Sequence, residues 1–152
     1  MDVAPVRVEP LGVFGDYRRL TKDVAELLLV PRINVVELGL REKIVSYLQF
    51  GTTVTNSLRY SDDMIDGRFV VPGGESSRTD GHYFWRADAS AYILEYGIEI
   101  PAEAIEHMRA HQWVAPAVGR AAFVGIDAYL EQQRRLTLEP RRFGGKGATT
   151  TT

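Results

Sequence analysis

The chain contains no cysteine, and lysine is scarce, with three lysines against 15 arginines. The absence of cysteine excludes disulfide bonds, thiolate metal ligands and a cysteine nucleophile. It also suits a reducing compartment, so we expect a cytoplasmic protein.

Long hydrophobic runs are absent as well. The purely apolar patch Leu27–Val30 is short and is closed by Pro31, whereas a membrane-spanning helix needs about 20 apolar residues. The N-terminus carries an acidic second residue, Asp2, and lacks the apolar stretch of a signal peptide. We therefore expect neither a membrane partner nor a signal peptide.

The net charge of −2 is unevenly distributed along the chain. Residues 60–80 carry five acids and two bases, and residues 86–111 carry the same numbers, so each segment has a charge of −3. Residues 134–152 carry five bases and one acid, a charge of +4. Nucleic-acid binding proteins usually show the reverse balance over their folded part, so we expect no nucleic-acid partner.

Apolar residues at helical spacing predict two helices in the first third of the chain. The first is expected over 21–30, with Thr21 as its N-cap. The second is expected over 35–50, with Asn34 as its N-cap and Gly51 in the left-handed conformation that often ends a helix.

β-branched and aromatic residues predict three strands in the middle of the chain, over 52–60, 68–72 and 82–85. The segment 73–81, rich in glycine and serine, is expected to be a loop. The consecutive aromatic residues of the third strand indicate that both faces of that strand are covered.

Three further helices are expected in the second half of the chain. They are a helix over 86–96 ended by Gly97, a helix that begins near Pro101, and a helix over 118–135.

Together these elements predict an α+β fold. We expect a small antiparallel sheet of three or four strands, with about five helices packed mainly on one side. The first 15 residues are expected to be irregular. One globular domain is predicted over 1–140, followed by a flexible basic and threonine-rich tail over 141–152.

Five aromatic residues lie close together in the sequence: Tyr83, Phe84, Trp85, Tyr92 and Tyr96. They could stack on nucleic-acid bases, but Arg86 is the one basic residue among them, so a place in the core is the better interpretation. Trp85 ends a strand and directly precedes a helix, and we expect its indole ring to lie between the sheet and that helix.

The motif SDDMIDG places Asp62, Asp63 and Asp66 close together. Aspartate side chains commonly hydrogen-bond the backbone of their own turn, which is the favoured interpretation. An acidic patch that faces a partner and a cation site are the alternatives, although the spacing does not match a calcium-binding loop. The residues proposed as partner contacts are Tyr60, Asp62, Asp63, Asp66, Glu75 and Asp80.

Glu103, His107 and His111 are spaced four residues apart and would project from one face of a helix. Such a His-x-x-x-His pair with a carboxylate could hold zinc. A solvated helix face is the favoured interpretation, because His82 is the one histidine left to complete a site. We therefore expect no metal, no cofactor and no catalytic residues.

The stretch TDGHYFW (79–85), followed by RADASAYILEYGIEIPAEAIEH (86–107), resembles a pattern in small uncharacterised bacterial proteins. Those proteins carry an Asp-Gly, an aromatic strand ending in tryptophan, a tyrosine-rich helix and a short crossing to an Ile-Pro helix start. This chain departs from the pattern at Ala89–Ala91, where its residues are smaller. The matching positions are Asp80, Gly81, Tyr83, Trp85, Asp88, Tyr92, Tyr96 and Pro101.

Many proteins with this pattern look like immunity proteins of polymorphic toxin systems. The resemblance implies a non-enzymatic protein that binds a partner toxin and occludes its active site. The acidic segment 60–80 would suit a basic cleft. Two alternatives stay open, a small metal-dependent enzyme that uses the His-x-x-x-His helix and a structural or assembly subunit anchored by the basic tail.

Overall fold

The computed structural model describes residues 7–15 and 20–148, and in the last helix it describes side chains up to Gln133 and at Arg135. The helices, strands and 3-10 turns are β1 (Glu9–Pro10), η1 (Gly12–Gly15), α1 (Lys22–Leu28), η2 (Val30–Arg32), α2 (Leu38–Gln49), β2 (Thr52–Thr55), β3 (Tyr60–Asp62), β4 (Val70–Pro72), β5 (Ser77–Thr79), β6 (Tyr83–Arg86), α3 (Ala89–Tyr96), α4 (Ala102–Ala110) and α5 (Arg120–Ala148).

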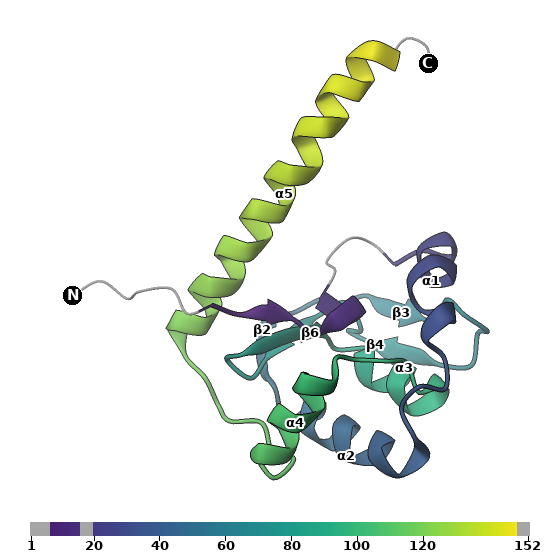
Figure 1. The fold of residues 1–152 in the computed structure, drawn as a ribbon, viewed down its shortest axis with the longest axis vertical. Helices are drawn as coiled ribbons and strands as arrows, with labels where there is room; N and C mark the ends of the chain where they lie inside the picture. The colour runs from purple at the N-terminus through teal and green to yellow at the C-terminus, as the bar shows by residue number, and fades with distance from the viewer. Residues whose placement is uncertain (1–6, 16–19, 149–152) are drawn as a thin grey trace.

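The elements form an α+β fold, as the sequence predicts (Figure 1). A four-stranded sheet has the order β1-β6-β5-β2, and β3 and β4 form a separate antiparallel hairpin. The larger sheet is mixed and not wholly antiparallel, because β1 pairs with β6 in parallel. The backbone N–H of Leu11 donates to the carbonyl oxygen of Phe84, so a segment expected to be irregular becomes an edge strand.

Two strand boundaries differ from the prediction. Strand β5 lies inside 73–81, which was expected to be a loop, and it pairs with β6 on one side and β2 on the other. The predicted strand 52–60 divides into β2 and the first residue of β3, which belong to different sheets. Pairing with other strands, which a short window of sequence does not show, therefore decides both cases.

Strand β6 is covered on both faces, which confirms the prediction from its aromatic residues. Tyr83 and Trp85 belong to the main core, which they share with α2, α3 and α4. Phe84 points to the other face and packs with Ala122 and Ile126 of α5. The helices therefore cover both faces of the sheet, with α5 opposite the other three (Figure 1).

Local sequence signals at two helix ends are confirmed. The Thr21 side-chain oxygen accepts a hydrogen bond from the backbone N–H of Val24 (3.2 Å) and caps α1. Gly97 ends α3 in the left-handed conformation, with φ of 64°, which glycine adopts without steric cost.

The predicted caps of α2 are wrong. Glu37, and not Asn34, precedes its first turn; the Asn34 side chain instead accepts a hydrogen bond from the Arg41 guanidinium (3.2 Å). Phe50 takes the C-cap position. Gly51 is required for space, because a Cβ there would lie 2.5 Å from Cζ2 of Trp85.

Helix α5 extends past residue 135, where the predicted helix ends, and includes part of the predicted tail. Residues 149–152 of that tail lie outside the described residues. In the part of the chain that the structure describes, no helix combines the length and the apolar character needed to cross a membrane.

Candidate functional site: an exposed hairpin face and a histidine cluster

Asp63 lies inside the protein, with 5% of its surface exposed. Its carboxylate accepts hydrogen bonds from the backbone N–H groups of Ile65 and Arg68 (2.8 Å each) and from the Tyr96 hydroxyl. Burial opposes ionisation of Asp63, but these hydrogen bonds outweigh it, so its pKa lies below the ordinary value. Asp63 therefore holds the turn between β3 and β4 against α3, which confirms turn chemistry at this position.

Asp80 plays the same part in the turn between β5 and β6, and 4% of its surface is exposed. It accepts hydrogen bonds from the backbone N–H groups of His82 (2.8 Å) and Tyr83 (2.7 Å). The Tyr47 hydroxyl and Nε2 of His107 (3.1 Å) also contact its carboxylate. Burial, reinforced by the neighbouring Asp80 carboxylate, raises the pKa of Tyr47 above its ordinary range.

Two of the six proposed partner contacts, Asp63 and Asp80, are therefore directed into the interior, so neither carboxylate is presented to a partner. Each is held by a tyrosine from a helix 33 residues away in the sequence.

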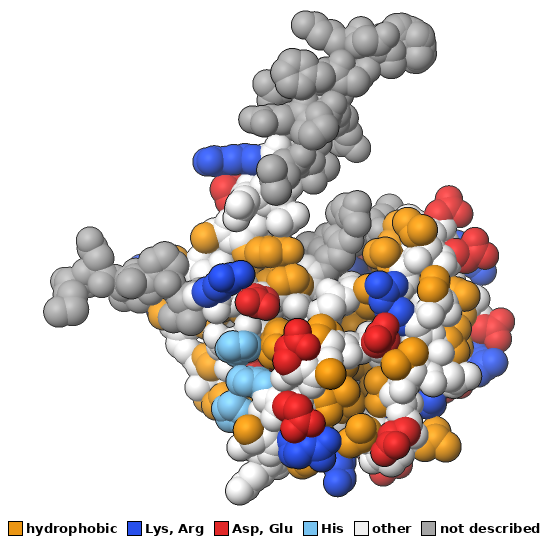
Figure 2. Space-filling view, in the orientation of Figure 1, with side chains coloured by type: hydrophobic (Ala, Val, Ile, Leu, Met, Phe, Trp, Pro, Cys, Tyr) orange, Lys and Arg blue, Asp and Glu red, His pale blue; other side chains and the backbone are white. Residues whose placement is uncertain are grey.

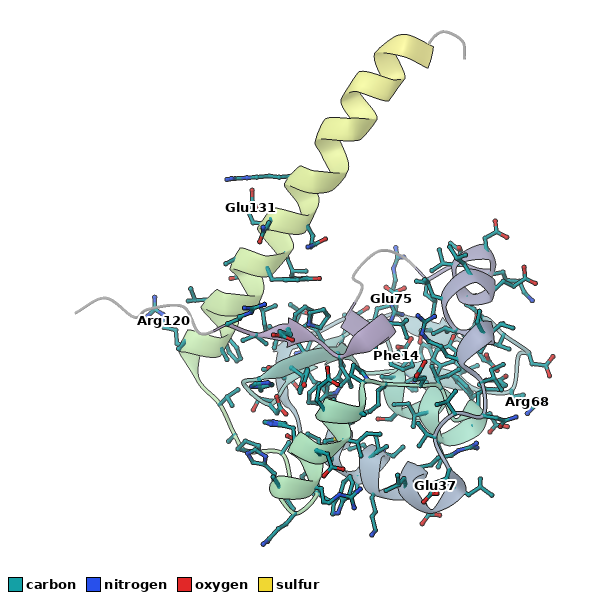
Figure 3. All side chains as sticks on the ribbon, in the orientation of Figure 1. Phe14, Glu37, Arg68, Glu75, Arg120 and Glu131 are labelled. Carbon is teal, nitrogen blue, oxygen red and sulfur yellow. The ribbon has the colours of Figure 1, made fainter. Side chains whose placement is uncertain are left out.

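The other four proposed contacts reach the surface, but not all in one place. Tyr60 is 68% exposed, and Asp62 and Asp66 are exposed too. Glu75 is half-buried. Burial lowers the pKa of the Arg86 guanidinium, but its ion pair with Asp88, with a smaller contribution from Glu75, raises that pKa above its ordinary value. Figure 3 shows Glu75 well away from Arg68.

The hairpin of β3 and β4 presents one face away from the core. Tyr60 is paired across the strands with Pro72, and Asp62 with Val70. All four side chains are exposed, and Val70 is 55% exposed. These four residues are called the hairpin face below. The face combines an aromatic ring, two apolar side chains and one carboxylate.

One end of the hairpin carries an exposed ion-pair network. The guanidinium of Arg68 contacts Asp66 and Glu95 at 3.1 Å each, and it lies 5.3 Å from the centre of the Tyr96 ring. The charge of Asp66 is thus partly compensated within the chain, whereas no ion pair is found for Asp62 among the described residues. Asp62 is therefore the carboxylate of this region with the least internal compensation.

The inner side of the hairpin is attached to the core by a buried polar network. The Ser61 hydroxyl donates to Asp88 (2.9 Å), and Asp88 forms a two-point ion pair with Arg86 (2.8 and 2.9 Å). Arg86 and Asp88 are both buried. The helix predicted over 86–96 would have put Asp88 in its first turn, and the sequence analysis did not predict the ion pair. The spacing of two residues between Arg86 and Asp88 was the signal that could have indicated it.

A groove of about 500 Å³ adjoins the hairpin. The residues that line it include Val71 and Pro72 of β4, Val45 of α2, Leu94 of α3 and Ser57. A molecule seated on the hairpin face would therefore have a recess at its margin.

The three histidines of the chain lie side by side on the surface, as Figure 2 shows. The rings of His82 and His107 are stacked with centres 4.6 Å apart, and the rings of His107 and His111 are 4.5 Å apart. The sequence did not indicate that His82 joins the two histidines of α4. The turn that brings it there is held by Asp80, which accepts hydrogen bonds from the backbone N–H groups of His82 and Tyr83. The three histidines are called the histidine cluster.

The proposed metal ligands Glu103, His107 and His111 do not converge. Nε2 of His107 contacts Asp80, and Nδ1 of His111 contacts the carbonyl oxygen of His107 (2.9 Å). Among the side chains that the structure describes, no three histidine or acidic groups are placed to hold one metal ion. The two histidines of α4 are therefore engaged with groups of the protein itself.

Comparison of the chain with protein-family models gives no match, and comparisons with curated proteins and with solved structures give no significant match.

Proposed function

We propose that this protein is a non-enzymatic binding protein of immunity type, which covers the active site of a partner toxin with its hairpin face. The observation that carries the proposal is the composition of that face. It places two of the residues singled out in the sequence, Tyr60 and Asp62, beside two exposed apolar residues, Val70 and Pro72.

The chemistry of the hairpin face suits a protein surface with a basic, partly apolar cleft. Tyrosine is enriched where binding energy concentrates in protein interfaces. Asp62, which has the least compensation within the chain, would attract a cationic cleft and favour the correct orientation. The buried Arg86–Asp88 pair holds the hairpin to the core and presents this face in a fixed position.

Site-specific photo-crosslinking tests the proposal in the native host. We expect benzoylphenylalanine at position 60 to crosslink to one protein, and that protein to be toxic to cells unless the present chain is co-expressed. The control is the same substitution at Leu27, an apolar residue of α1 that is 72% exposed. Equal crosslinking from both positions, or a captured protein whose toxicity the chain does not relieve, would contradict the proposal.

A further inference from the structure

We infer that the histidine cluster is a proton-operated latch, which holds α4 against the turn between β5 and β6 at neutral pH and loosens it on acidification. The first observation is that the cluster joins two elements. His82 belongs to the turn and His107 to α4, and their rings are stacked at 24°. The bond from His107 to the buried Asp80 joins the same two elements.

The partners of two rings fix their neutral tautomers. An ionised Asp80 can only accept a hydrogen bond, so Nε2 of His107 carries the proton in that contact. The carbonyl oxygen of His107 is likewise an acceptor, so Nδ1 of His111 carries a proton. The neutral cluster is thus compatible with every hydrogen bond that the structure gives it.

Protonation places like charges in contact. The rings of the cluster are about 4.5 Å apart, and two unit positive charges at that separation repel each other strongly when partly shielded from water. Asp80 is the carboxylate bonded to the cluster, and it also accepts from Tyr47 and from two backbone N–H groups. Among the described residues, the contact between Asp80 and His107 is the one ion pair or hydrogen bond between a carboxylate and a ring of the cluster.

The other ionisable groups around the cluster come from four elements. Tyr47 of α2 lies 6.5 Å from the His111 ring, and Tyr83 of β6 lies 5.5 Å from the His107 ring. Burial is the main cause that raises the pKa of Tyr83, and the charges of Glu103 of α4 and Glu9 of β1 raise it further. Lys43 of α2 and Arg109 of α4 lie over the Trp113 ring.

The pH response has a definite sign. Burial and the two neighbouring imidazoles outweigh the attraction of Asp80, so the pKa of His107 lies below its ordinary value of 6.5. As the pH falls below about 6.5, a state in which α4 has separated from the turn binds more protons than the closed state, in which α4 is held against it. The closed state therefore loses stability in that range. Above this range the latch is fully closed.

Nuclear magnetic resonance of the full chain tests the inference without any ligand. We expect His107 to titrate below 6.5, and its midpoint to rise in the variants His82→Gln and His111→Gln, each of which removes one neighbouring imidazole. Amide-exchange protection factors of α4 should fall between pH 7 and pH 5 by about tenfold for each pKa unit by which His107 is depressed. Those of α3 should stay constant, which provides an internal reference.

His82→Gln should reduce the loss of protection in α4, because it removes an imidazole that lowers the pKa of His107. His111→Gln, at a site on α4 itself, gives a second variant if His82→Gln perturbs the turn. The inference is overturned if the His107 midpoint is the same in the wild type and both variants. It is equally overturned if α4 loses no more protection than α3 on acidification.

Discussion

Replacement of Trp85 by alanine is expected to lower the free energy of unfolding by about 3–5 kcal/mol. The indole ring was predicted to lie between the sheet and the helix that follows it, α3. It is 1% exposed and packs against α2, with its centre 6.3 Å from that of Tyr47 and its edge against Gly51. Its Nε1 has no hydrogen-bond partner among the described residues, so the loss comes from packing and from the cavity left behind. A domain of this size has about 5–15 kcal/mol of stability in total.

Thermal and urea unfolding of the Trp85→Ala variant measures this effect, and Tyr60→Ala is the matched control. Tyr60 is also aromatic but is 68% exposed on the hairpin face, so its removal should change stability by less than about 0.5 kcal/mol. If the two variants melt at the same temperature, the described position of the Trp85 ring between sheet and helix is wrong.

Replacement of Asp88 by alanine is expected to cost a similar amount, about 3–5 kcal/mol. The change leaves the buried guanidinium of Arg86 without its carboxylate and the buried Ser61 hydroxyl without its acceptor. An uncompensated buried charge is far more costly than the loss of an exposed pair. Because Ser61 belongs to β3, the hairpin should also lose one of its attachments to the core.

The control for Asp88→Ala is Glu95→Ala, which breaks an exposed ion pair with Arg68. Exposed pairs contribute about 0–1 kcal/mol, so this variant should unfold close to the wild type in urea. The double variant Arg86→Leu with Asp88→Leu removes both charges and should recover part of the stability. Equal unfolding midpoints for Asp88→Ala and Glu95→Ala would show that the Arg86–Asp88 network does not support the fold.

Local signals in the sequence were enough to predict the helix ends at Thr21 and Gly97, because a side-chain cap and a left-handed glycine depend on a few neighbouring residues. They were not enough for β1 or β5. Those strands exist because β6 pairs with both, and residues 9–10 are more than 70 positions from their partners. Strand pairing leaves little trace in a short window of sequence, both for β1 with its distant partner and for β5 with its neighbour β6.

The acidic segment shows the same limit at the candidate site. The count of charges predicted an acidic surface over residues 60–80. Asp63 and Asp80 are nevertheless buried, and each accepts a hydrogen bond from a tyrosine hydroxyl, that of Tyr96 and that of Tyr47 respectively. Alternation along β3 could separate Tyr60 and Asp62 from the inward-facing Ser61, but only once the strand boundaries were known. The grouping of His82 with α4 likewise required the turn that Asp80 holds.

The central claim is that the hairpin face binds a protein partner, and the affinity of that partner for two double variants tests it most directly. One variant combines Tyr60→Ala with Asp62→Lys on the hairpin face. The other combines Leu27→Ala with Glu26→Lys on α1, which removes a similar exposed apolar side chain and changes the charge by the same amount.

Calorimetric titration with the protein crosslinked from position 60 should show that the hairpin variant binds about 30-fold more weakly than the wild type, corresponding to about 2 kcal/mol. The α1 variant should bind within about threefold of the wild type, and both variants should keep the wild-type melting temperature. Wild-type affinity for the hairpin variant, or equal weakening in both variants, would contradict the assignment of this face as the binding surface.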